Sequence, residues 1–191
     1  MRYIQTLSML IALTVLLNGC VTSSNSTLTS KADPDVAVQR YVQLGLEYIK
    51  RDDLHRARKH LTRALEIAPE DASANAAFGL ISHQEGDIKT AEISFKKAIA
   101  SDENYTRGRT YYGAFLFSEK RYKQALEQFE VAANDTAYVG RSQIFTNIAL
   151  CNVKLNNNEY RLGALRNLVD LNQFEYVNEY NLLRDKIVSE K

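Results

Sequence analysis

The chain has no tryptophan, only two prolines and two cysteines, and eight glycines among its 191 residues. So little proline and glycine leaves few places where a helix must stop, which favours long helices over many short strands. Two cysteines are too few for the disulfide framework of a small secreted domain. The 24 basic and 23 acidic residues are too balanced for a protein that binds nucleic acid by neutralising phosphates. We therefore expect an all-α protein with no nucleic-acid partner.

The sequence also lacks the motifs of common enzyme and metal sites. It contains no glycine-rich phosphate loop, no zinc-protease motif and no nucleophile elbow. His55 and His60 are five residues apart, which is the wrong spacing for one face of a helix, and His83 is isolated. We expect no catalysis, no cofactor, no metal ion and no small-molecule substrate.

Residues 1–19 have the features of a secretory signal peptide, with a basic start and an apolar stretch too short and too polar to span a bilayer. Residues 17–20 are Leu-Asn-Gly-Cys, which resembles the bacterial lipobox. That resemblance implies that Cys20 carries acyl chains, palmitate among them, and becomes the mature N-terminus. The alternative is an ordinary signal peptide with an incidental cysteine. Val21 stands where inner-membrane lipoproteins often carry aspartate, so analogy favours the outer membrane.

Two further expectations follow from an acylated N-terminus. Residues 20–34 are rich in serine, threonine and asparagine, and we interpret them as a flexible tether between lipid and domain. If Cys20 is lipidated, Cys151 is the one remaining thiol. It is flanked by apolar residues, so we expect a buried core residue there and not a nucleophile.

Columns of small and large residues recur every 34 residues, which is the length of the tetratricopeptide repeat. Small residues let two antiparallel helices approach, and large side chains fill the space around the contact. We expect a right-handed tetratricopeptide superhelix, an α-solenoid of about four helix pairs, over residues 35–172. A C-terminal capping helix is expected over 173–191. The predicted packing residues are Tyr41, Leu44, Gly45, Tyr48, Ala57, Leu61, Ala64, Gly79, Ala91, Phe95, Gly113, Ala125 and Phe129.

The fourth copy departs from this period. Ala149 lies 36 residues after Gly113, so about two residues are inserted, within 134–141. Arg161 occupies a position that holds alanine in the earlier copies. We expect this helix pair to pack more loosely.

More specific features lie at residues 41–48, 112–116, 138–141 and 150–151. Together with the lipobox they resemble the type IV pilus biogenesis lipoproteins, the pilotins often called PilF or PilW. The resemblance implies an outer-membrane lipoprotein on the periplasmic face. Its partner would be a PilQ-like pilus secretin, whose localisation and multimerisation it promotes, and twitching motility would depend on it. Family members commonly carry more repeats, and no complete fifth copy follows Asn172.

A pilotin needs a groove that holds a secretin subunit. In the first helix of a repeat, the residues beside the packing positions line the concave surface, and in copy one they are apolar where a surface helix would be polar. Such a groove suits an amphipathic or extended partner segment. The alternative is that the tether around Leu28, or the turn near Val36, covers this face and completes the core. The predicted groove residues are Val42, Leu46, Ile49, Leu80, His83 and Phe117.

The basic run over residues 50–63 allows two interpretations. We interpret it as a solvated face balanced by nearby acids, and the competing interpretation is contact with anionic lipid headgroups. The function that competes with the pilotin role is that of a general periplasmic tetratricopeptide adaptor lipoprotein, which docks peptidoglycan or other envelope enzymes.

Overall fold

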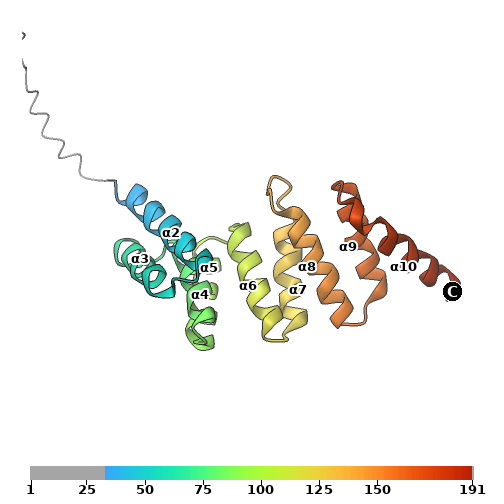
Figure 1. Cartoon of the computed structure of the whole chain (residues 1–191), viewed down its shortest axis with the longest axis horizontal. Coiled ribbons are helices and arrows are strands. Elements are labelled where there is room, and N and C mark those ends of the chain that lie inside the picture. Colours follow the sequence, from blue (N-terminus) through green and yellow to red (C-terminus); the bar gives the residue numbers. More distant parts are fainter. Residues whose placement is uncertain (1–32, 191) are drawn as a thin grey trace, which may run out of the picture. The chain divides into compact units, whose positions relative to one another are not determined.

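The computed structural model describes residues 33–190, and all regular secondary structure in this range is helical. Four helix pairs follow one another, as Figure 1 shows, and a final helix packs on the last pair. The prediction of an all-α array of four pairs and a C-terminal helix is confirmed. The elements are α2 (Pro34–Lys50), α3 (Leu54–Ile67), α4 (Ala72–Gln84), α5 (Ile88–Ser101), α6 (Thr106–Ser118), α7 (Tyr122–Ala133), α8 (Arg141–Lys154), α9 (Asn158–Asp170), the 3₁₀ turn η1 (Phe174–Tyr176) and α10 (Val177–Ser189).

Several N-terminal predictions fall outside the described residues: the signal peptide 1–19, the lipidation site Cys20 and the tether as far as residue 32. The remaining tether residues already belong to the helical domain. Asp33 is the N-cap of α2, and Pro34 is its first residue, a position where the missing proline N–H costs no hydrogen bond. In the described part of the chain, no helix has the length and apolar character needed to cross a bilayer.

The turn between the two helices of a pair repeats its conformation. Asp52, Gly86 and Lys120 all have left-handed backbones, with φ of 58°, 83° and 61°. Each lies just past the end of a first helix, where a left-handed residue stops the helix and reverses the chain. The following residues Asp53 and Asp87 then cap α3 and α5, because each carboxylate accepts a hydrogen bond from a backbone N–H of the first turn at 3.1 and 3.0 Å.

Inside each of the first three pairs, a glycine lies directly against a large buried side chain. A Cβ built on Gly113 would lie 2.7 Å from Cε1 of Phe129, which is closer than real Cβ contacts allow. The ring of Phe129 is only 1% exposed and has no free space to move into. The equivalent contacts are Gly45–Leu61 at 2.5 Å and Gly79–Phe95 at 2.8 Å. The predicted alanines Ala57, Ala64, Ala91 and Ala125 are all fully buried beside these contacts.

The aromatic residues of α2 pack against α3 through one histidine. Tyr41 and Tyr48 both stack on the ring of His60, with centroids 6.0 and 5.4 Å apart. His60 therefore belongs to the packing of the first pair.

The prediction that Leu44 packs inside the first pair is wrong, because its side chain is 42% exposed. The same position in the next two copies contacts the second helix of the preceding copy. Phe78 lies beneath the Arg58 guanidinium, 4.9 Å from ring centroid to Cζ, and Tyr112 stacks on Phe95 at 5.8 Å. In residues 33–190 no second helix precedes α2. Leu44 therefore has no described helix to pack on.

Buried side chains form two clusters. One comes from α2, α3 and α4, and the other extends from α5 to α10, where Leu183 is its last member. Cys151 lies within the second cluster with its side chain fully buried, and burial raises the pKa of its thiol to about 12. The prediction that Cys151 is a core residue is confirmed.

The insertion before the fourth pair is a longer connection. Residues 134–140 join α7 to α8, whereas residues 68–71 and 102–105 make the two equivalent connections. In the fourth pair, Arg161 turns toward α10 and forms an ion pair with Glu179 at 2.5 Å. The arginine therefore joins the fourth pair to the last helix.

Candidate partner-binding groove

A groove of about 620 Å³ runs along α2. The apolar part of its lining comes from Val36, Val42 and Leu46 of α2, of which Val42 and Leu46 are four residues apart and share one face of the helix. Val42 is nearly buried, whereas Val36 is 47% exposed at the rim. We name this surface the α2 groove; its lining residues are Asp35, Val36, Gln39, Arg40, Val42, Gln43, Leu46, Glu47, Lys50, Ser73 and Arg107.

The α2 groove also includes one residue from each of the next two first helices. Gln39, Ser73 and Arg107 all line it, and they are spaced by 34 in the sequence. The first helices of successive repeats therefore turn the same face toward this groove. Sequence reasoning missed Ser73 and Arg107, although the 34-residue period that identified the glycines also relates these positions.

Of the six predicted groove residues, the structure brings only Val42 and Leu46 into the α2 groove. Val42 and Leu46 also belong to or pack against the N-terminal core cluster, as Ile49 does, and Leu80 packs against the second cluster. The other two face rings. His83 meets Phe115 edge-on at 5.2 Å, and Phe117 meets Tyr122 in the same way at 5.2 Å.

The rim of the α2 groove carries both signs of charge with an excess of basic groups. Arg40, Lys50 and Arg107 line it together with Asp35 and Glu47. Glu47 is also bound by Arg51 on the next turn, at 2.8 Å. An apolar floor with a basic rim suits a partner segment that has apolar and acidic side chains.

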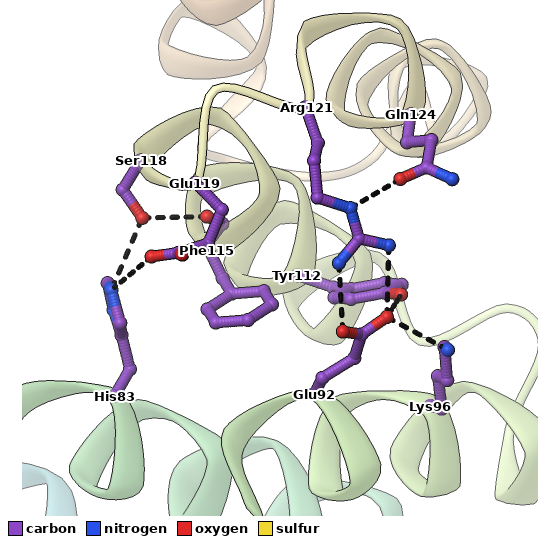
Figure 2. Close-up of polar contacts among 9 residues, drawn as sticks. All are labelled: His83, Glu92, Lys96, Tyr112, Phe115, Ser118, Glu119, Arg121 and Gln124. Carbon is purple, nitrogen blue, oxygen red and sulfur yellow. Dashed lines mark hydrogen bonds and ion pairs between the residues drawn. The ribbon is translucent and has the colours of Figure 1, made fainter. Parts of the chain in front are cut away.

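The junction between the second and third pairs contains an ion pair between α5 and the start of α7, and Figure 2 shows it in detail. Arg121 donates two hydrogen bonds to the Glu92 carboxylate, at 2.8 and 3.0 Å, and Lys96 approaches the same group at 2.9 Å. These two cations lower the pKa of Glu92 to about 2. Beside them, His83 lies 3.2 Å from the Ser118 hydroxyl.

The junction between the first and second pairs uses the same position with the opposite charge. Arg58, which is 34 residues before Glu92, forms an ion pair with Glu85 and covers the Phe78 ring. Other residues of the basic run pair with acids on their own or a neighbouring turn: Arg51–Glu47 at 2.8 Å, Arg56–Asp53 at 2.8 Å and Arg63–Glu66 at 2.7 Å. Much of this basic run is therefore an exposed surface with its charges locally balanced.

Within residues 33–190, no three histidine, cysteine, aspartate or glutamate side chains group as metal ligands.

Sequence comparison identifies two of the repeats and two informative relatives. The tetratricopeptide repeat model matches residues 38–71 and 72–105. The type IV pilus assembly protein PilF of Pseudomonas aeruginosa PAO1 is 38% identical over 144 residues, which cover 75% of this chain and 57% of PilF. An uncharacterised protein of Haemophilus influenzae Rd is 30% identical over 136 residues, covering 70% of this chain and 73% of that protein. This chain thus spans little more than half the length of the Pseudomonas protein.

Solved structures agree with this relationship. The structure of Pseudomonas aeruginosa PilF matches with a TM-score of 0.74 and 32% identity, over 82% of this chain and 71% of that one. The structure of PilW, described as a widely conserved type IV pilus biogenesis factor, matches with a TM-score of 0.65. It covers 71% of this chain and 62% of that one, at 20% identity, which is a likeness of fold alone. The predicted tetratricopeptide superhelix is confirmed.

Proposed function

The chain belongs to the PilF family of type IV pilus tetratricopeptide-repeat proteins, and from this premise we propose that it acts as a pilotin. In this role it binds subunits of the pilus secretin and promotes their localisation to the outer membrane and their multimerisation. Its contribution is to hold a partner in place, without catalysis, as is usual for a helical-repeat scaffold.

The observation that carries the proposal is the α2 groove. Its apolar lining consists of the exposed Val36, the partly exposed Leu46 and the buried Val42 beneath them, on the face shared by the first helices. A continuous apolar surface bounded by charged side chains is typical of a protein-binding site. The excess of basic groups at its rim, Arg40, Lys50 and Arg107, favours a secretin segment with acidic residues next to its apolar ones.

The lipid anchor is the second part of the proposal and rests on the sequence. Cys20 closes a lipobox-like segment, and acylation there would hold the protein on the periplasmic face of the outer membrane. A single acyl chain binds a bilayer only marginally, so stable anchoring needs more than one. A secretin subunit held by the α2 groove would then be delivered to the membrane in which it assembles.

The test is the amount of heat-resistant secretin multimer in outer-membrane fractions. Strains with the wild-type gene, a deletion, Cys20→Ala and Val36→Glu are compared. Val36→Glu places a carboxylate in the groove at a position that is already 47% exposed, so the fold is retained. Leu44→Glu is the matched control, because Leu44 lies on the same helix, is 42% exposed and does not line the groove.

We expect less multimer in the deletion and Val36→Glu strains and a normal amount with Leu44→Glu. With Cys20→Ala, multimer should form and accumulate in the wrong membrane. An unchanged amount in the deletion strain would exclude the pilotin role and leave the general envelope adaptor as the better account. Equal effects of Val36→Glu and Leu44→Glu would exclude the α2 groove as the secretin site.

A further inference from the structure

The connection 134–140, which is longer than its equivalents, is tied to the first turn of α6. Thr106 is 8% exposed, and its hydroxyl donates a hydrogen bond to Oδ2 of Asp135 at 2.7 Å. The other oxygen of this carboxylate accepts a hydrogen bond from the backbone N–H of Ala137 at 3.1 Å. An aspartate that joins its own turn to a buried hydroxyl of another helix fixes the connection on α6.

Tyr138 of this connection reaches the side chain of Arg107. The Tyr138 ring lies against Gly140, where an added Cβ would be 2.6 Å from Cε1, and it packs on the second core cluster. Its hydroxyl interacts with the Arg107 guanidinium. Partial burial lowers the pKa of Arg107, and the interactions with Tyr138, Tyr105 and Tyr111 raise it by more. Arg107 is therefore an exposed arginine whose guanidinium is held by tyrosines.

The same guanidinium lines the α2 groove. The equivalent residues of the other copies are Gln39, Ser73 and Gln143, so the third copy alone places a charge at this position. In the part of the chain that the structure describes, the groups that interact with Arg107 are tyrosines, and no carboxylate is among them. Arg107 therefore offers the groove a cation that no acid of its own chain neutralises.

Two physical reasons favour Arg107 over the other cations of the α2 groove as the group that binds an acid. A side chain that is already held in place loses less conformational freedom when a partner binds. The planar guanidinium also presents parallel N–H groups that match a carboxylate, whereas the ammonium of Lys50 is a point charge. Arg40, the other arginine that lines the groove, lies on α2 itself.

We propose that Arg107 is the specificity-determining residue of the α2 groove, where it binds an aspartate or glutamate side chain of the secretin segment. Tyr138 is the positioning residue that holds Arg107 for this contact. The inference rests on the proposed pilotin function and adds the residue that selects the partner. Apolar side chains beside the acid contact Val36 and Leu46. A segment with lysine or arginine in place of the acid is rejected, because it would bring two cations together.

The test is the affinity of the full mature chain, in detergent micelles, for the purified periplasmic region of the secretin at low and high salt. The variants are Arg107→Gln, Tyr138→Phe and the double variant. Arg40→Gln removes the other arginine of the groove. Arg166→Gln is the matched control, because Arg166 is an exposed arginine of α9 that does not line the groove.

We expect Arg107→Gln to weaken binding about tenfold and to reduce its dependence on salt, because one charge pair is lost. Tyr138→Phe keeps the ring against Gly140 and removes the hydroxyl. It should weaken binding about threefold alone and not at all in the Arg107→Gln background, because it acts through Arg107. Arg166→Gln should bind as the wild type does.

Unchanged affinity of Arg107→Gln, or a loss no larger than that of Arg40→Gln, would overturn the assignment of Arg107. Additive losses in the double variant would overturn the positioning role of Tyr138. Val36→Glu, measured beside them, separates this inference from the proposed function. If Val36→Glu abolishes binding and Arg107→Gln does not weaken it, the α2 groove remains the secretin site and Arg107 alone is excluded. A wild-type chain that binds no secretin would overturn both.

Discussion

The contacts inside the helix pairs and the contacts between them are built on different physical principles. Inside the first three pairs, the same contact recurs, a glycine against a large buried side chain such as Phe129. Between pairs, the side chains change from one junction to the next. At the first junction, Arg58 forms an ion pair with Glu85. At the second junction, the repeat position of Arg58 is occupied by Glu92, which forms an ion pair with Arg121.

The difference separates contacts that depend on the space between two helices from contacts that depend on the charge of the side chains. Two helices that touch through Gly113 leave no room for a larger side chain, so this glycine contact is the same in each of the first three copies. An ion pair between copies needs only opposite charges, and it works with either sign on either helix. Because Arg58 and Glu92 have opposite charges at the same repeat position, a copy of the second pair in place of the first would bring two carboxylates together at that junction.

The largest expected effect comes from breaking the contact inside a pair. Gly113→Val would place a side chain 2.7 Å or less from the Phe129 ring, and overpacking of this kind should lower the free energy of unfolding by about 3 kcal/mol. The measurement is urea denaturation followed by circular dichroism. The matched control is Gly163→Val, also within a helix but beside open space. Equal losses in the two variants would show that helix propensity, and not packing, controls stability here.

A smaller effect is expected from reversing one charge between pairs. Arg58→Glu removes the ion pair and the cation over Phe78 and sets two carboxylates together, which should cost about 1.5 kcal/mol. The double variant Arg58→Glu/Glu85→Arg restores opposite charges and should recover most of the ion-pair contribution. Thermal unfolding of the wild type, both single variants and the double variant measures the coupling. Additive losses in the double variant would contradict the ion-pair account.

The second junction should make the stability of the protein depend on pH in the acidic range. The pKa of Glu92 is lowered from 4.5 to about 2 by Arg121 and Lys96. A carboxyl group whose folded-state pKa is lowered adds stability that is fully present above its unfolded pKa, and this stability is lost as the pH falls from about 4.5 toward 2. Wild type should therefore lose more stability over this range than Glu92→Gln. Parallel curves for the two proteins would show that Glu92 contributes nothing to the acid response.

The smallest expected effect is a gain. Lys120 has a φ of 61°, in the left-handed region where the same position of copy two has Gly86. Lys120→Gly removes this strain and should raise the free energy of unfolding by up to about 1 kcal/mol, less the entropy that glycine loses on folding. Gly86→Ala is the converse change and should be destabilising. A loss of stability in Lys120→Gly would mean that the lysine side chain outweighs the backbone strain.

The parts of the fold that depend on repetition were predictable from the sequence. The 34-residue period located Gly45, Gly79 and Gly113 because a close helix contact demands a small residue wherever it occurs. Leu44 was mispredicted for the same reason, because the period transfers a contact between copies to a copy whose preceding helix is not among residues 33–190. A period gives the position of a side chain within a repeat and cannot say which neighbours that repeat has.

The candidate sites were predicted less completely, for two physical reasons. Val42 and Leu46 were found because they are apolar at helical spacing. His83 and Phe117 share that spacing, but each meets a ring, Phe115 or Tyr122, that pairwise spacing could not reveal. A second cavity, lined by residues of α7, α8 and α9 such as Phe145 and Gly163, went unnoticed because its shape is set by side chains from three helices.

The burial of Cys151 makes the domain suitable for labelling. A thiol with a pKa raised to about 12 and no solvent contact stays protonated at neutral pH and does not react with maleimides. Cys20 lies outside residues 33–190, so a fragment covering this range presents no reactive thiol of its own. A cysteine introduced at Val36 would be the one that takes a fluorophore. Occupation of the α2 groove could then be followed as an optical signal.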